Sequence, residues 1–304
     1  MAGWDGDALI FAMQEAFEKT KGISKYGEVA SYIPVLEKVD PEYFSLSISY
    51  QDKIYSIGDR EVKFSIQSIS KVISLIMAIE LFGKDKVFEF VGMENCDKAF
   101  NGLGCVKKIP VNPMVNAGAI VIISMLYEKY REKTIDKFIE FIVNFSGRDD
   151  IYLDEEVYSS EIATCAMNRS IVHYLNHLNL IKDDCEEILE QYIKCCSVSA
   201  NTEAIALMAE KIAMGNGDKV KSSSSSIACA IMATSGMYEN TGEYMMRVGI
   251  PSKSGVSGII LGSSPGKCGL AVYSPRLNQY GNSYRGVKVM EILSESLNLN
   301  IYKG

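Results

Sequence analysis

The chain has 304 residues, of which 47% are hydrophobic and 23% are charged; this composition is typical of a soluble globular enzyme with one large domain or two modest ones. The formal net charge is −7 and the basic residues are scattered, so neither nucleic acid nor an anionic membrane is expected as a partner. No apolar run has the length of a membrane span, and the acidic, amphipathic start at 1–21 is unlike a secretion signal, so we expect a cytoplasmic location.

The expected elements run from a first helix through a hairpin and a long helical middle to strands and a last helix. Residues 44–50 and 53–59 alternate apolar and polar side chains across a tight connection, which predicts a β-hairpin. Helical periodicity follows at 69–82, 118–132, 134–147, 155–180, 201–215 and 227–236. Three short β-rich segments and a closing amphipathic helix are expected at 244–250, 257–263, 268–274 and 285–299.

Segregated strands and helices of this kind predict an α+β fold, with an antiparallel sheet flanked by helices and a separate helical lobe. The first and last segments of the chain are expected to share that sheet. We therefore expect a single catalytic domain over 1–304, in which 1–68 and 237–304 form an α/β lobe and 69–236 form a mainly helical lobe.

The cysteines and histidines predict neither a disulfide framework nor a metal site. Eight cysteines occur without a CxxC motif and several lie in apolar helical segments, so we expect them to be reduced and buried. His173 and His177 share a helix face but lack the HExxH pattern, and they are the only candidates for the base of a Ser-His-Asp triad. The pair Cys195-Cys196 and the five serines at 222–226 receive no role; a cap or loop edge before a helix suffices for the serines.

The segment 64–83 places Ser68 and Lys71 three residues apart in an otherwise apolar run. S-x-x-K is the nucleophile–base pair of serine acyltransferases that lack histidine. Burial would lower the lysine pKa enough for it to take the serine proton, and the N–H groups at a helix start suit an oxyanion. The alternative is that neither residue is catalytic: Ser68 is simply a small residue of the helix, and the aliphatic part of the Lys71 side chain covers apolar surface. A second S-x-x-K at 264–267 contains Pro-Gly and is expected to be a turn, so the tetrapeptide alone is not specific.

Two later motifs strengthen the catalytic interpretation. Tyr238-Glu239-Asn240 gives Y-x-N and Lys253-Ser254-Gly255 gives K-[ST]-G, in the order found in the β-lactamase and penicillin-binding class. A tyrosine near the pair can relay protons, and an edge strand at K-[ST]-G can supply an N–H group to an oxyanion hole. Taken separately, Tyr238 could be an aromatic residue in a turn, and Lys253-Ser254-Gly255 could be a polar turn.

With these motifs the chain resembles the serine-dependent glutaminase family, which has a β-lactamase-like fold. The resemblance extends from about residue 22 to 290, and NPMVNAGAI and GIPSKSGVSG are its most specific stretches. The matching segments are 31–44, 64–75, 112–121, 192–198, 235–260 and 280–286, together with the spacing of Glu161 and Asn168. Without a long N-terminal extension or C-terminal repeats, the chain resembles the short, bacterial-type enzyme of this family.

The resemblance implies hydrolysis of free L-glutamine to L-glutamate and ammonia, without a metal or organic cofactor. It implies that Ser68 is the nucleophile, Lys71 its base and Tyr238 a proton relay, and that the N–H groups of Ser68 and Val256 hold the oxyanion. It further implies that the substrate is held by Tyr32, Asn116, Glu161, Asn168 and Tyr192, and that the protein is a homodimer or homotetramer.

These residue types suit free glutamine. Glu161 offers a counter-charge to the α-ammonium group, and the asparagines and tyrosines offer neutral hydrogen bonds. Glutamine within a peptide should be rejected because its end groups are amides, and asparagine should be disfavoured because it is one methylene shorter. On their own, Glu161 and Asn168 could equally be solvated helix positions, and Asn116 a turn residue.

Two alternative functions stay open at this point. The first is a β-lactamase or D,D-peptidase of the same fold, against which the absence of a signal peptide argues. The second is a non-catalytic amino-acid-binding module in which Lys71 is protonated and idle. Nitrocefin hydrolysis would identify the first, and glutamine binding without ammonia release would identify the second.

Overall fold

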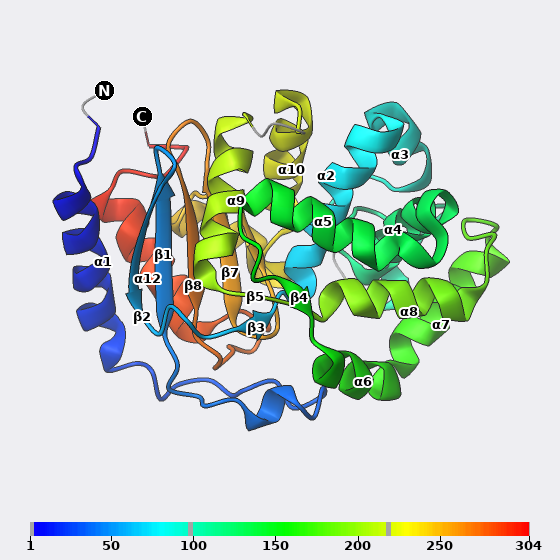
Figure 1. Cartoon of the computed structure of the whole chain (residues 1–304), viewed down its shortest axis with the longest axis horizontal. Coiled ribbons are helices and arrows are strands. Elements are labelled where there is room, and N and C mark those ends of the chain that lie inside the picture. The colour runs from blue at the N-terminus through cyan, green and yellow to red at the C-terminus, as the bar shows by residue number, and fades with distance from the viewer. Residues whose placement is uncertain (1–2, 97–99, 217–219, 304) are drawn as a thin grey trace.

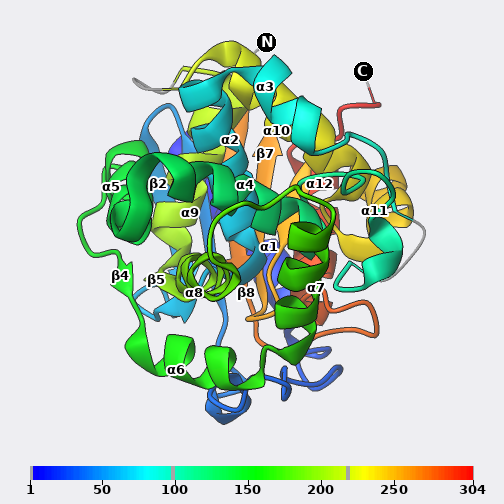
Figure 2. The same cartoon turned by 90° about the vertical axis from the view of Figure 1, so that its right-hand side faces the viewer.

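The computed structural model describes residues 3–96, 100–216 and 220–303. Figure 1 shows a sheet with its flanking helices beside a group of helices, and helix α9 lies between the two. Figure 2, seen from the helical side, places α7 and α8 in front of the sheet. Among the described residues, no helix combines the length and the apolar content needed to cross a membrane.

The main sheet has five strands in the order β2-β1-β8-β7-β6, and every neighbouring pair is antiparallel. Its strands are β1 (Ser45–Tyr50), β2 (Lys53–Gly58), β6 (Ser252–Ser254), β7 (Ile259–Ser264) and β8 (Cys268–Tyr273). Strand β1 pairs with β8, with Ile48 opposite Leu270, so the first and last segments of the chain do share one sheet. The predicted α+β fold, with an antiparallel sheet flanked by helices, is thereby confirmed.

One face of the sheet is covered by the two ends of the chain. Helices α1 (Gly6–Lys21), α11 (Thr241–Arg247) and α12 (Tyr284–Ser296) enclose a core with the apolar side chains of β1, β7 and β8. Leu46 and Ile48 of β1 point into this core and are fully buried. Burial of side chains of this size contributes ~1.5–3 kcal/mol each, which fixes which face of the hairpin points inward.

The other face is covered by α9 (Thr202–Met214), so the polar side of β1 is buried rather than solvated. Ser45 and Ser47 both contact the Thr202 hydroxyl, at 2.7 and 2.8 Å. Further along α9, Gly269 of β8 lies opposite Ser49 and lets the helix approach closely: a Cβ on Gly269 would lie 2.2 Å from the carbonyl oxygen of Ala206. Alternate side chains of β1 therefore face opposite ways: the apolar ones enter the core, and the serines form hydrogen bonds with α9.

The remaining helices form the second group, built on the apolar helices α2 and α4. Their bounds are α2 (Ser70–Phe82), α3 (Lys84–Phe90), α4 (Asn116–Tyr130), α5 (Thr134–Ser146), α6 (Glu155–Thr164), α7 (Ala166–His177), α8 (Cys185–Cys196) and α10 (Ser222–Ser235). A small sheet of order β3-β5-β4 lies near the start of α2, with β3 (Phe64–Ser65), β4 (Tyr152–Leu153) and β5 (Val198–Ala200). The division into two lobes at residues 68 and 237 stays a prediction; α9 contacts β1, β7 and β8 as well as helices of the second group.

Three expected elements differ from the structure. The segment 244–250 is not a strand: α11 occupies it as far as Arg247, because Tyr244, Met245 and Val248 are buried at helical spacing while Met246 is exposed. The segment 155–180 is two helices, because Cys165 leaves the helical conformation between α6 and α7.

The serine tract is also placed differently. It does not precede a helix but forms the first turns of α10. The Glu80 carboxylate of α2 accepts hydrogen bonds from the backbone N–H of Lys221 at 2.6 Å and from the hydroxyl of Ser224 at 2.5 Å. A side chain from another helix thus satisfies this helix start, which local sequence could not reveal.

The expectation that all eight cysteines are reduced is wrong for two of them. Cys96 and Cys105 form a disulfide with a Cα–Cα distance of 5.7 Å. Both lie between α3 and α4, outside the helices on which the expectation rested. The free cysteines are Cys165, Cys185, Cys195, Cys196, Cys229 and Cys268, and all except Cys185 are buried.

Candidate active site

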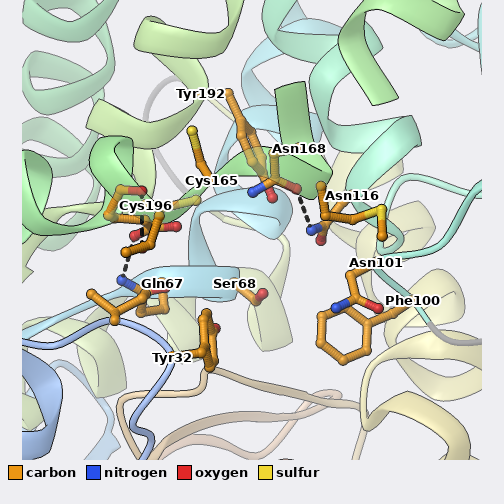
Figure 3. Close-up of a pocket in the computed structure, with 14 residues that line it drawn as sticks. Tyr32, Gln67, Ser68, Phe100, Asn101, Asn116, Cys165, Asn168, Tyr192 and Cys196 are labelled. Carbon is orange, nitrogen blue, oxygen red and sulfur yellow. Dashed lines mark hydrogen bonds between the residues drawn. The ribbon is translucent and has the colours of Figure 1, made fainter. Parts of the chain in front are cut away.

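A cavity of about 140 Å³ lies where the start of α2 meets α4, α6, α7 and α8. Figure 3 shows Ser68 near the middle of this site, with Tyr32 on one side and the pair Asn116 and Asn168 on another. The cavity is lined by Tyr32, Ile33, Gln67, Ser68, Phe100, Asn101, Asn116, Glu161, Thr164, Cys165, Met167, Asn168, Tyr192 and Cys196.

Ser68 occupies a strained turn rather than the body of a helix. It lies in the 3-10 turn Gln67–Ile69, directly before α2, and its side chain is 8% exposed. Gln67 has a φ of +47°, a conformation that non-glycine residues seldom adopt and that clusters at functional sites. The serine is therefore held at a helix start, facing the cavity.

Lys71 follows within the first turn of α2 and is 1% exposed. Its Nζ donates to Asn116 Oδ1 at 2.6 Å and to the carbonyl oxygen of Met114 at 3.2 Å. Burial lowers the pKa of Lys71 to about 8, although Cys196 and Glu161 oppose this shift. A neutral amine has two hydrogens, which these two acceptors can use, and its lone pair then remains for a proton.

Tyr238 lies beside Ser68 and is equally well held. Its hydroxyl donates to the carbonyl oxygen of Ser254 at 3.0 Å. The Ser68 hydroxyl is near enough to oppose, in part, the effect of burial on the pKa of Tyr238. Because its own hydrogen points to Ser254, the tyrosine oxygen is left to accept from the serine. Burial raises the pKa of Tyr238, so the phenol stays neutral.

The Tyr238 ring is enclosed by two further side chains. Phe100 stacks on it with ring centroids 4.3 Å apart, and the buried amine of Lys253 lies 4.3 Å from its centre. Lys253 also donates to the carbonyl oxygens of Ser254, at 2.7 Å, and Gly236. Burial holds the pKa of Lys253 well below its ordinary value.

Glu161 is the buried carboxylate of the cavity. It projects from α6 and accepts a hydrogen bond from Gln67 Nε2 at 3.0 Å. Burial raises the pKa of Glu161 to about 7, against the opposing effects of Gln67 and Lys71. A cation placed beside this carboxylate would favour its charged form.

Asn116 and Asn168 form a pair that is oriented by the lysine. Because Lys71 donates to Asn116 Oδ1, the Asn116 amide nitrogen points away and donates to Asn168 Oδ1 at 2.8 Å. This leaves the amide nitrogen of Asn168 without a hydrogen bond in the described part of the chain, at the cavity surface. Neutral N–H donors at such a position suit a carboxylate.

Val256 and Tyr32 lie at the outer side of the site. Val256 follows the edge strand β6 and lines a wider groove, whose wall also includes Tyr32 and Phe100 of the cavity. A Cβ on Gly255 would lie 3.0 Å from the carbonyl oxygen of Ile66, so the K-S-G segment abuts the turn that carries Ser68. Tyr32 is 58% exposed, in contrast to the buried Tyr192 on the inner wall.

The structure thus brings together the residues that the sequence singled out. Six of them line one cavity: Tyr32, Ser68, Asn116, Glu161, Asn168 and Tyr192. Lys71 and Tyr238 contact members of that set, and Val256 lines the adjoining groove. Sequence reasoning missed Gln67, Phe100 and Cys196; only Gln67 carried a local signal, as the neighbour of the serine.

His173 and His177 lie on α7, outside the cavity lining. Across residues 3–96, 100–216 and 220–303, no group of three or more His, Cys, Asp and Glu side chains could hold a metal ion.

A buried Ser-Lys pair at the start of a helix, beside an antiparallel sheet whose edge strand carries K-S-G, defines a β-lactamase-like protein. A model of the Glutaminase family matches residues 27–302, and the chain belongs to that family.

Curated relatives and solved structures agree with this assignment. The chain is 37% identical to Glutaminase 2 of Bacillus subtilis, over 95% of this chain and 97% of that protein. It is 38% identical to a glutaminase of Clostridium tetani, over 95% and 98%. Among solved structures, a probable glutaminase from Bacillus subtilis in complex with 6-diazo-5-oxo-L-norleucine has a TM-score of 0.87 at 32% identity, covering 99% of each chain.

Proposed function

We propose that the protein hydrolyses the side-chain amide of free L-glutamine to L-glutamate and ammonia. Membership of the glutaminase family supports this reaction, and the solved relative with 6-diazo-5-oxo-L-norleucine supports a small amino-acid substrate. The observation that carries the proposed mechanism is the buried amine of Lys71, with a pKa lowered to about 8 and two carbonyl acceptors, next to the serine turn.

In the first step, neutral Lys71 takes the proton of Ser68 as the serine oxygen attacks the side-chain carbonyl carbon of glutamine. The C–N bond then breaks, and the lysine returns its proton to the leaving ammonia. Water hydrolyses the resulting glutamyl ester by the same proton path, releasing glutamate and restoring the serine. Lysine fits the role of base better than Tyr238, because burial raises the pKa of the phenol, which therefore stays protonated and offers no tyrosinate to accept the serine proton.

Tyr238 would then support the serine, while Lys71 carries the proton; the relay role that the family resemblance implies for Tyr238 is not needed in this path. The Tyr238 hydrogen bond to Ser254 fixes the phenol, whose oxygen would then accept from the Ser68 hydroxyl and orient it. The developing oxyanion would be held by the backbone N–H groups of Ser68 and Val256. The position of Ser68 before α2 and the contact of the K-S-G segment with the preceding residues support this pairing.

The substrate would lie with its α-amino end on the inner wall. Glu161 would pair with the α-ammonium, and Asn168 and Tyr192 would donate to the α-carboxylate, while Asn116 links this end to the base. Tyr32 would close the outer side. A substrate one methylene shorter would not reach Ser68 while its charged ends stay in place.

The test is ammonia release from L-glutamine by the wild type and by Ser68→Ala. We expect release by the wild type and a loss of at least ~1,000-fold in the variant, because removing a nucleophile leaves only binding and oxyanion contributions. L-asparagine and a peptide-bound glutamine should be inert. Equal rates for wild type and variant would refute the serine mechanism.

Two controls address the alternative functions. Nitrocefin should not be hydrolysed; turnover would move the protein towards the β-lactamase class. Isothermal titration calorimetry of the Ser68→Ala variant with L-glutamine should show binding without turnover. If the wild type also binds glutamine and releases no ammonia, the amino-acid-binding module is the better description.

We further infer a homodimer or homotetramer and a cytoplasmic location, which the family resemblance supports. Light scattering coupled to size-exclusion chromatography tests the first, and cell fractionation with an antibody to the protein tests the second. A monomer, or recovery outside the cytoplasm, would contradict them.

A further inference from the structure

The disulfide between Cys96 and Cys105 lies next to the candidate active site. The two cysteines are nine positions apart, and Phe100 and Asn101 of the cavity wall lie between them in the chain. The bond therefore closes a ring of backbone that includes part of the cavity.

The segment around the disulfide is packed by few apolar side chains. Its small core consists of Cys105, Val111 and Val115, with Cys96 and Phe100 packed against them, and it is separate from the two large cores. Two of its five members are thus the bonded cysteines. A segment with so little buried apolar surface depends strongly on a covalent tether.

Phe100 connects this small core to the catalytic groups by three contacts. Its ring stacks on Tyr238 at 4.3 Å between centroids and faces the Lys71 amine at 5.5 Å. Its carbonyl oxygen accepts the backbone N–H of Asn116 at 2.9 Å. Displacement of Phe100 would therefore loosen the packing of Tyr238, remove an apolar wall from Lys71 and release a contact at the start of α4.

We propose that the Cys96–Cys105 disulfide is a redox switch that controls how firmly Phe100 is held against Tyr238 and Lys71, and thereby the rate of catalysis. The effect on rate rests on the proposed function; the tether itself does not. In reducing compartments, protein disulfides are commonly transient or redox-sensing, which suits a bond placed beside an active site.

The bond is open to reduction from one side. Cys96 is partly exposed, whereas Cys105 is fully buried. A dithiol reductant would attack the Cys96 sulfur, form a mixed disulfide and displace Cys105 as a thiolate, which takes up a proton. The second thiol of the reductant then releases Cys96, so two electrons pass to the protein and the reductant becomes a cyclic disulfide.

The experiment compares oxidised and dithiothreitol-reduced wild type, with the state of Cys96 and Cys105 read by alkylation and mass spectrometry. We expect reduction to lower kcat/KM for L-glutamine by about tenfold, since misplacement of a positioning group by ~1 Å can cost up to ~100-fold. Hydrogen exchange of the amides in 100–116 should become faster. The variant Cys96→Ser/Cys105→Ala should have the lower rate with or without reductant, while Cys185→Ser, which changes a free cysteine outside the cavity, should respond like the wild type.

An unchanged kcat/KM in fully reduced protein would overturn the switch, and so would free thiols at both positions in protein purified without reductant. Protein that releases no ammonia in either state would refute the proposed function instead. In that case, faster exchange of 100–116 on reduction would support the tether, and unchanged exchange would refute it.

Discussion

The Lys71 amine donates a 2.6 Å hydrogen bond to the side-chain oxygen of Asn116, a residue 45 positions later in the chain. This contact joins the candidate base to the first residue of α4 and orients the Asn116 amide towards Asn168. One hydrogen bond thus couples the proton-transfer side of the cavity to the side that would bind the substrate.

Replacing Lys71 by methionine should abolish turnover without unfolding the protein. Methionine keeps a long side chain in the buried position and removes the amine that would take the serine proton. We expect ammonia release to fall at least ~1,000-fold while the melting temperature stays the same or rises, because burial of an amine is costly. A rate close to that of the wild type would show that another group is the base.

The pH dependence of kcat/KM should rise with pH through about 8. Only neutral Lys71 can accept a proton, and its pKa is lowered to about 8, so the active fraction grows as the pH rises through this value. Steady-state rates between about pH 6 and pH 9 measure the curve. A flat curve over this range would contradict the assignment.

The same lysine predicts how stability depends on pH. In the folded chain Lys71 releases its proton at about pH 8, and in the unfolded chain at about 10.5, so the unfolded state binds more protons between these values. The free energy of unfolding gains a contribution that increases with pH across this window. Urea titrations at several pH values should show that the Lys71→Met variant lacks this contribution, and an unchanged slope would contradict it.

Glu161→Gln should weaken substrate binding more than it slows the chemical step. The amide keeps the shape and the contact with Gln67 but removes the counter-charge for the α-ammonium. Loss of one partner of a buried charge pair costs ~2–5 kcal/mol, so we expect KM to rise by at least ~30-fold. Glu155→Gln, an exposed carboxylate on the same helix, is the matched control and should leave KM unchanged. A similar KM for both variants would show that Glu161 does not contribute to substrate binding.

Gly269→Ala should destabilise the contact between α9 and the sheet. The added methyl would lie 2.1 Å from the backbone nitrogen of Glu210 and 2.2 Å from the carbonyl oxygen of Ala206, and backbone cannot move aside cheaply. We expect the free energy of unfolding to fall by ~3 kcal/mol or more, measured by urea titration. Gly266→Ala is the control: its φ is +69° but no atom lies within 4 Å, so its cost should be only ~1–2 kcal/mol. Equal effects would show that the close approach is unimportant.

Much of the fold follows from local pattern. The hairpin at 44–59 was predictable because its side chains alternate between apolar and polar. The apolar helix after Ser68 and the last two strands were predictable because each is an apolar or β-rich run that ends at turn residues such as Gly83; all three are buried on every side. The pattern failed at α11, where a short apolar run fits a strand and a helix equally well. It also failed at Cys165, because a single non-helical residue hardly disturbs the periodicity around it.

The sequence by itself determined the identities of the candidate site residues and the family, because motifs and their order are properties of the chain. Only the tertiary structure decided their environment: which amine is buried, which carboxylate has its pKa raised, and which cysteines meet. Lys71 is shielded from water because the buried helices α2 and α4 pack together around it. Cys96 and Cys105 can bond because the fold brings their Cα atoms to 5.7 Å. Burial and proximity depend on residues far apart in the chain, and no local pattern encodes them.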